Sequence, residues 1–111
     1  MKTRKALPTL FILLLLGCGK PVPQEKSTYV GEWQEKNMYL LIGQDGRVKY
    51  KRVQGSASTS IDGPIKDFVG DNFDVGVWRM STTFVVSRPP YEDKGQWKMV
   101  VDGVELTRTA R

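Results

Sequence analysis

Histidine is absent from this chain of 111 residues, and cysteine occurs once, at Cys18. Histidine is the commonest general base near neutral pH, and histidine and cysteine are the commonest zinc ligands. A single cysteine also rules out a disulfide within the chain. These absences argue against an enzyme, a zinc site and a disulfide-stabilised fold. We therefore expect no catalytic residues, no bound metal and no cofactor.

The other polar groups that carry out catalysis lack suitable neighbours. The serines of residues 55–60 lie in a stretch rich in Gly and Ser, which predicts a flexible loop, and no base lies beside them to activate a hydroxyl. Glu92 and Asp93 are the only adjacent acidic residues, and they follow Pro89 and Pro90 in what we expect to be a solvated turn. Neither group indicates an active site.

A helical repeat of apolar residues is also missing after residue 28. Short segments of alternating apolar and polar residues are instead separated by Gly, Asp, Asn or Pro, roughly every eight to twelve residues. This pattern predicts an all-β domain, a small antiparallel meander that closes into a barrel or a strongly curled sandwich. Closure hides both the apolar faces and the strand edges. The predicted strands span residues 29–33, 38–43, 47–53, 59–61, 65–69, 73–77, 82–87, 96–101 and 104–108.

Turn chemistry sets the register of the last predicted hairpin. Asp102-Gly103 is typical of a two-residue type I′ turn, which places Val101 opposite Val104. The apolar residues of both strands then share one face. These residues are Trp97, Met99, Val101, Val104 and Leu106.

A second hairpin surrounds residues 44–46. Their sequence, Gln-Asp-Gly, predicts a three-residue loop with Gly46 in the left-handed conformation, which sets Ile42 opposite Val48. A two-residue turn would shift the register by one and place Lys49 opposite Ile42. The bulged form instead gives one apolar face, made of Met38, Leu40, Ile42, Val48 and Tyr50.

Basic residues are concentrated on the predicted strand 47–53. Four of its residues are cationic: Arg47, Lys49, Lys51 and Arg52. In the preferred register Lys49 and Lys51 project outward next to Leu41 and Tyr39, which makes a basic face with an apolar floor. Such a face suits lipid A phosphates, an acidic glycan or an acidic partner protein. The alternative is that these charges only block aggregation between sheets.

The three tryptophans differ in their surroundings. Trp33 and Trp97 fall in phase with the apolar side of their strands, so we expect both in the core. Trp78, beside Arg79 and Met80, breaks the alternation between two strands, which predicts a loop tip. An exposed aromatic at a loop tip favours contact with a partner or ligand. The alternative is that Trp78 folds back over the barrel mouth.

The start of the chain has the pattern of an export signal. Residues 1–5, which include the basic Lys2, Arg4 and Lys5, precede an apolar run at residues 6–16 that is too short to span a bilayer stably. The motif Leu15-Leu16-Gly17-Cys18 resembles the cleavage site of bacterial lipoprotein signal peptides. That resemblance implies cleavage before Cys18 and a membrane anchor of several acyl chains on this cysteine. The alternative is a secreted protein whose cysteine stays free.

The same resemblance bears on location. Related lipoproteins that carry Asp after the cysteine stay at the inner membrane, whereas this chain has Gly19, which implies the outer membrane, facing the periplasm. We expect a signal peptide at residues 1–17, the lipidated cysteine and a flexible tether at residues 18–28, and one β domain at residues 29–111. Three of the 17 basic residues lie in the signal, which leaves 14 against 12 acidic residues, a net charge of +2. This small charge, together with export, argues against a nucleic-acid partner.

Two further resemblances concern the domain. Gly31-Glu32-Trp33 resembles the Gly-x-Trp motif in the first strand of lipocalin-like barrels, where Trp plugs the closed end. Residues 29–108, including Gly63-Pro64-Ile65 and Gly70-Asp71-Asn72-Phe73, resemble small uncharacterised β-rich lipoproteins of Gram-negative bacteria. We therefore expect a non-enzymatic, membrane-anchored module that binds an envelope protein or an anionic envelope polymer. The alternative is a lipocalin-like carrier of a small apolar ligand.

Overall fold

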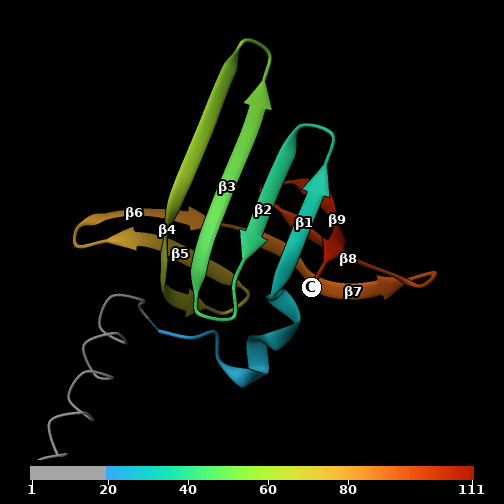
Figure 1. Ribbon diagram of the computed structural model, residues 1–111, viewed down its shortest axis with the longest axis horizontal. Helices are drawn as coiled ribbons and strands as arrows, with labels where there is room; N and C mark the ends of the chain where they lie inside the picture. The colour runs from blue at the N-terminus through green and yellow to red at the C-terminus, as the bar shows by residue number, and fades with distance from the viewer. Residues whose placement is uncertain (1–19) are drawn as a thin grey trace, which may run out of the picture.

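A computed structural model describes residues 20–111 and shows nine strands joined in one antiparallel sheet (Figure 1). Along the sheet the strands follow the order β6-β5-β4-β3-β2-β1-β9-β8-β7. Consecutive strands are neighbours except β6 and β7, which form the two ends of this order. The sheet curls into a half-barrel, which confirms the predicted all-β antiparallel fold. The predicted signal peptide and Cys18 lie outside the described residues.

The described chain begins with a short irregular segment and the 3₁₀ helix η2 (Gln24–Tyr29). The strands that follow are β1 (Gly31–Glu35), β2 (Met38–Ile42), β3 (Arg47–Gln54), β4 (Ala57–Val69), β5 (Asn72–Val77), β6 (Met80–Phe84), β7 (Val86–Asp93), β8 (Gln96–Val101) and β9 (Val104–Ala110). Within residues 20–111, no helix is long and apolar enough to cross a membrane.

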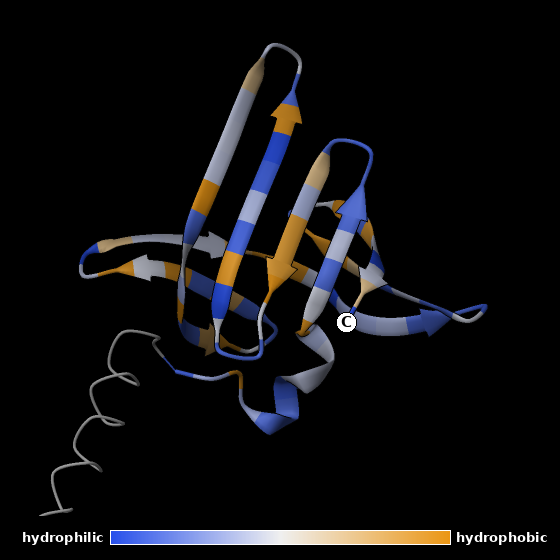
Figure 2. Cartoon of the chain, viewed as in Figure 1, coloured by the Kyte–Doolittle hydropathy of each residue, from blue (hydrophilic) through white to orange (hydrophobic). Residues whose placement is uncertain are grey.

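Both predicted hairpin registers are confirmed. Val101 pairs with Val104, and Asp102 and Gly103 both have positive φ, as a type I′ turn requires. Ile42 pairs with Val48 across the bulged loop, where Gly46 has a φ of 86°. The apolar faces are therefore buried as expected, except that Trp97 and Val104 are only partly buried against the core. Figure 2 shows the alternation of hydrophobic and hydrophilic residues along β3.

Strand β4 corrects three of the predictions. The predicted strands 59–61 and 65–69 are parts of this one strand, and the predicted flexible loop 55–60 is a tight turn followed by the start of β4. The first part of β4, up to Pro64, pairs with β3, whereas the part from Ile65 onward pairs with β5. Gly63-Pro64 therefore lies at the bend where β4 changes partner, not between two strands.

The predicted strand 82–87 is divided between β6 and β7. The intervening Val85 is bonded to Asp102 instead of to a neighbouring strand. The Asp102 N–H donates to the Val85 carbonyl, and the Val85 N–H donates to the Asp102 carboxylate. Strand β7 continues through Pro89 and Pro90, so the predicted turn at Glu92 and Asp93 is wrong. Proline fits because β7 is an edge strand, where a missing N–H costs no ladder hydrogen bond.

The N-terminal segment packs against the domain, so the predicted flexible tether is wrong for residues 20–28. Val22 is only 5% exposed, and its N–H donates to the Gln44 carbonyl at 3.0 Å. A Cβ on Gly46 would collide with the backbone oxygen of Lys20, so this turn accepts the segment only with glycine. Helix η2 then leads into the core, where Tyr29 is buried. Burial of Val22 fixes the segment on the domain, although this residue is the only large apolar one among the prolines and charged residues of the segment.

The core lies between the strands of the curled sheet. Figure 1 shows β5 and β6 running across the direction of β1–β3, and Phe84 of β6 packs edge-on against Tyr50 of β3, with ring centroids 4.9 Å apart. Phe84 also stacks on Phe73 at 5.1 Å. The largest fully buried side chains are Trp33, Leu40, Ile42, Val48, Phe73, Val75, Phe84, Met99, Val101 and Leu106. Aromatic and branched side chains thus fill the interior of the half-barrel.

Candidate binding surfaces

Three of the four predicted basic residues share the outer face of β3. Arg47, Lys49 and Lys51 are exposed and alternate with the buried Val48 and Tyr50. We call Arg47, Lys49 and Lys51 the basic strip. Register places Lys49 beside Leu41 and Lys51 beside Tyr39 on β2, as the sequence predicts.

Acidic residues flank the basic strip on both sides. On β4, Asp62 lies opposite Lys49 and accepts a salt bridge from Arg47 at 3.2 Å. Both partners of that salt bridge are about half exposed, so water screens it strongly. Lys49 and Lys51 form no salt bridge with any described residue. These two ammonium groups are therefore the part of the strip that is free to meet an anion.

On the other side of the strip, Glu32 anchors a hydrogen-bond network. Its carboxylate accepts from the hydroxyl groups of Tyr39, at 2.8 Å, and Thr109, at 2.9 Å. The bond from Tyr39 is the main reason that the pKa of Glu32 is lowered, and the same bond raises the pKa of Tyr39. Glu32 therefore stays charged, and the Tyr39 ring is held in place beside Lys51.

The strip borders an open hollow of about 270 Å³. The hollow is lined by Tyr39, Lys49, Tyr50, Lys51, Ser60, Ile61 and Asp62. Leu41 and Tyr39 lie beside the two lysines on this outer face, so the predicted basic face with an apolar floor is present. Tyr50 and Ile61 pair with each other in phase with the buried Val48, so their side chains leave on the other face of the sheet. The arrangement can hold an anionic group by charge and stack a flat group on tyrosine.

Arg52 does not belong to this surface. It lies in phase with Val48 and Tyr50, so its side chain leaves β3 on the opposite side from Lys49 and Lys51. There it lines a separate hollow with Glu35 and Glu105, at the end of the sheet beyond the core. Arg52, a candidate binding residue together with the other three cations, is thus separated from them, because consecutive residues of a strand point to opposite faces.

Trp78 lies at the tip of the β5–β6 hairpin and is 90% exposed, so it does not fold back over the half-barrel. Its φ of 58° is left-handed, a conformation that a tryptophan rarely adopts. The exposed Val77 and Met80 flank it, and these residues with Arg79 line a mainly apolar surface that is separate from the hollow beside Lys49. The basic strip and Trp78 are thus two surfaces, not one site.

Lys66 of β4 is a functional candidate that sequence reasoning missed. Its Nζ donates to the Trp78 carbonyl at 2.6 Å and so supports the turn at the hairpin tip. The bend of β4 brings Lys66 near this turn, and no local pattern reveals the contact.

Arg108 is a second residue that sequence reasoning missed. Its guanidinium lies over the rings of Trp33 and Trp97, at 5.8 Å and 5.2 Å from their centroids. One nitrogen, Nη1, is buried without a hydrogen-bond partner among the described residues, and burial lowers the pKa of Arg108. A signal was present in the sequence, since Arg108 follows Val104 and Leu106 on the inward face of β9.

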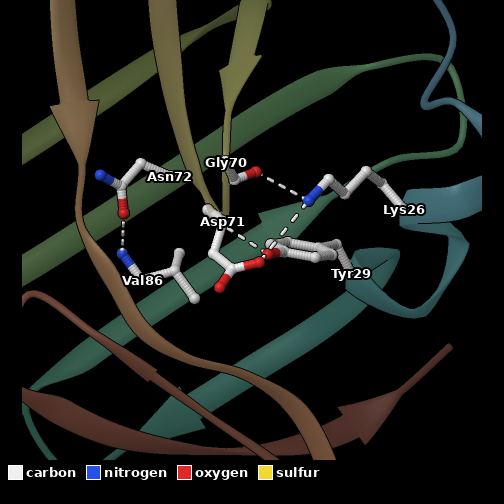
Figure 3. Close-up of polar contacts among 6 residues, drawn as sticks. All are labelled: Lys26, Tyr29, Gly70, Asp71, Asn72 and Val86. Atoms are coloured by element: carbon white, nitrogen blue, oxygen red, sulfur yellow. Dashed lines mark hydrogen bonds and ion pairs between the residues drawn. The ribbon is translucent and has the colours of Figure 1, made fainter.

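The polar cluster in Figure 3 joins helix η2 to the turn between β4 and β5. Lys26 donates to the Gly70 carbonyl at 2.8 Å, and the Tyr29 hydroxyl donates to the Asp71 carbonyl at 2.8 Å. Burial, helped by the charge of Asp71, raises the pKa of Tyr29 to about 12. Nearby, Asn72 accepts from the N–H of Val86 at 2.8 Å. These contacts satisfy turn carbonyls and join η2 to the β4–β5 turn, which is a structural role.

The described residues define a small curled all-β domain with a filled interior, an exposed basic strip and a separate apolar hairpin tip. Among residues 20–111, no group of three Asp, Glu, His or Cys side chains is placed to hold a metal ion. Comparisons with protein-family profiles, with curated proteins and with solved structures gave no match to this chain.

Proposed function

We propose that this protein is a lipid-anchored lipoprotein of the bacterial envelope that acts as a non-enzymatic binding module, with the basic strip as its contact for an anionic partner. The anchor rests on the signal-like residues 1–17 and on Cys18 at their end. The partner is an envelope protein or polymer that carries negative charge. The proposed location is the outer membrane, with the domain in the periplasm.

One observation carries the binding proposal. The register places Lys49 and Lys51 side by side on the outer face, unpaired among the described residues, next to the tyrosine-lined hollow. The alternative is that these charges, on a sheet edge or on an exterior face, only block aggregation. The edge form suits this position poorly, because β3 is paired on both sides, with β2 and with β4. Edge protection is needed at strands with a free edge. The exterior-face form is separated from binding by the strip variant described below.

The carrier alternative finds less support in the interior. A lipocalin-like carrier needs an apolar cavity inside the barrel. Here Trp33, Phe73 and Phe84 are fully buried in the middle of the domain, and the two phenylalanine rings stack at 5.1 Å. Close packing of this kind leaves no room for a ligand unless the core opens.

The anchor is tested by Cys18→Ser in the full chain. Wild-type protein should incorporate a palmitate analogue and partition into the detergent phase, and the variant should do neither, because several acyl chains are needed for lasting attachment. Detergent-phase partitioning that is unchanged in Cys18→Ser would refute the anchor without touching the basic strip.

The strip is tested by the double variant Lys49→Gln and Lys51→Gln, with Lys94→Gln and Arg111→Gln as a control that removes the same charge elsewhere. The defined probe is fluorescent poly-L-glutamate, supplemented by crosslinking in intact envelopes. The strip variant should bind several-fold more weakly at low salt, with a smaller difference at high salt, because exposed charges are screened within about 10 Å at 0.1 M ionic strength. Equal binding by strip and control variants would support a role in solubility alone.

A further inference from the structure

Three of the six exposed large apolar residues of the described chain, including the only Trp and Met among them, gather at one hairpin tip, whereas Val53, Val69 and Val85 lie elsewhere. Trp78 is 90%, Met80 77% and Val77 56% exposed, and all three lie at the β5–β6 turn. Figure 1 shows this turn projecting as the free end of a two-stranded ribbon. Large exposed apolar groups that gather at one place mark interaction sites, whereas scattered ones do not.

The backbone at this tip is strained at Trp78, and a soluble turn does not need a tryptophan in a strained position. Trp78 adopts a φ of 58°, where glycine would be favoured, so the turn costs free energy to place an indole in water. The Lys66 ammonium bonds to the Trp78 carbonyl at 2.6 Å and holds the strained turn. Strain that a neighbouring side chain supports is a common feature of functional loops.

The tip lies on the same side of the molecule as the start of the described chain. Lys66 and the segment Lys20–Pro23 line one hollow of about 250 Å³. Figure 1 shows the blue start of the described chain and the β5–β6 tip at the same side of the domain. Because Lys20 packs on Gly46, only Gly19 separates Cys18 from the packed chain. Two residues reach about 7 Å, so an anchor on Cys18 brings this side of the domain against the lipid.

The charges at this side also suit a membrane surface. Lys20, Lys66 and Arg79 are all exposed, and the acidic residues of the same hollow are Glu25 and Asp67. Glu25 and Asp67 balance Lys20 and Lys66 in the hollow, so the uncompensated positive charge beside the tip is that of Arg79, which forms no salt bridge with any described residue. Tryptophan concentrates at membrane–water interfaces, and basic residues near a membrane attract anionic headgroups.

We propose that the β5–β6 tip inserts into the interfacial layer of the membrane that holds Cys18, with Trp78 at the level of the headgroups and Arg79 and Lys66 beside lipid phosphates. This inference rests on the proposed lipid anchor. The domain is then held at two points and has a defined orientation on the membrane. Strand β3 starts near the anchored side and is eight residues long, so the β3–β4 turn at its far end lies about 26 Å away from that side.

Full-length protein, reconstituted in vesicles of phosphatidylethanolamine and phosphatidylglycerol with brominated acyl chains, tests this proposal. Bromine quenches a tryptophan only where it meets the lipid. Wild type should lose fluorescence, Trp78→Phe should lose several-fold less, and the matched control Trp97→Phe should behave as wild type. Trp78→Gly, which suits the left-handed backbone, should also abolish the quenching while the domain stays folded.

The outcomes separate this inference from the anchor. Mass spectrometry of the N-terminal peptide shows whether Cys18 is acylated, and a peptide without acyl chains would refute the proposed anchor. The difference in bromine quenching between Trp78→Phe and Trp97→Phe reports on the tip whether or not Cys18 is acylated. An acylated protein whose Trp78 is not quenched by bromine and remains open to aqueous acrylamide would overturn the tip proposal. Protection of Trp78 from acrylamide in native membranes, without bromine quenching in vesicles, would overturn it in favour of a protein partner.

Discussion

Gly46→Ala should be much more destabilising than Gly103→Ala, although the two glycines have nearly the same backbone conformation. Their φ angles are 86° and 81°, so each alanine should lose about 1–2 kcal/mol to left-handed strain. They differ in surroundings, because a Cβ on Gly103 meets nothing within 4 Å, whereas one on Gly46 collides with the backbone of Lys20. The pair therefore isolates the packing of the N-terminal segment.

The extra cost at Gly46 follows from what the displaced segment gives up. Burial of Val22 contributes about 1.5–3 kcal/mol, and the hydrogen bond from Val22 to Gln44 about 0.5–1.5 kcal/mol. Freeing a few residues returns some conformational entropy. We expect Gly46→Ala to lose about 2 kcal/mol more than Gly103→Ala. In a domain of this size that difference corresponds to about 8–16 °C in Tm.

Urea denaturation followed by tryptophan fluorescence measures both variants. Val22→Ser provides the second measurement, because it should cost about 2 kcal/mol in wild type and little in the Gly46→Ala background, where the segment is already displaced. Equal midpoints for Gly46→Ala and Gly103→Ala, with additive effects of Val22→Ser, would refute the packed segment. They would restore the flexible tether expected from composition.

Two further predictions concern Tyr29 and the hairpin turns. Because the pKa of Tyr29 is raised from 10.0 to about 12, folding favours its protonated form, and the stability that it contributes should be complete below pH 10 and lost as the pH rises to about 12. Wild type should therefore lose more stability over that range than Tyr29→Phe, and parallel urea midpoints from pH 9 to 12 would contradict this. Gly55→Val and Gly103→Val should each cost about 1–3 kcal/mol, because both glycines have positive φ in open turns. A thermal melt of Gly55→Val that matched wild type would show that the β3–β4 turn is irregular.

The features predicted correctly from the sequence are those that depend on neighbours along the chain. Asp102-Gly103 and the loop ending in Gly46 each determine a turn, and the turn determines which residues of the two strands face each other. Alternation then places Lys49 and Lys51 outside. The same alternation places Arg52 on the opposite face, so the sequence alone is enough to separate Arg52 from the two lysines.

Other features depend on contacts between distant parts of the chain. Strand β4 continues through Gly63-Pro64 because a second partner, β5, takes over the hydrogen bonds that β3 gives up. The composition of residues 20–28 predicts a polar tether, but the segment packs against the turn at Gly46, and this contact buries Val22. In both cases the local sequence is compatible with an irregular segment, and tertiary packing decides otherwise.

The sequence by itself determined the all-β class, the hairpin registers and the outward position of the two free lysines, because each follows from a two-residue period and from turn chemistry. Only the tertiary structure decided that the sheet stays open between β6 and β7, that the N-terminal segment packs down, and that Lys66 supports the Trp78 turn. These depend on the curvature of the whole sheet and on burial against residues far away in the chain. No local pattern encodes them.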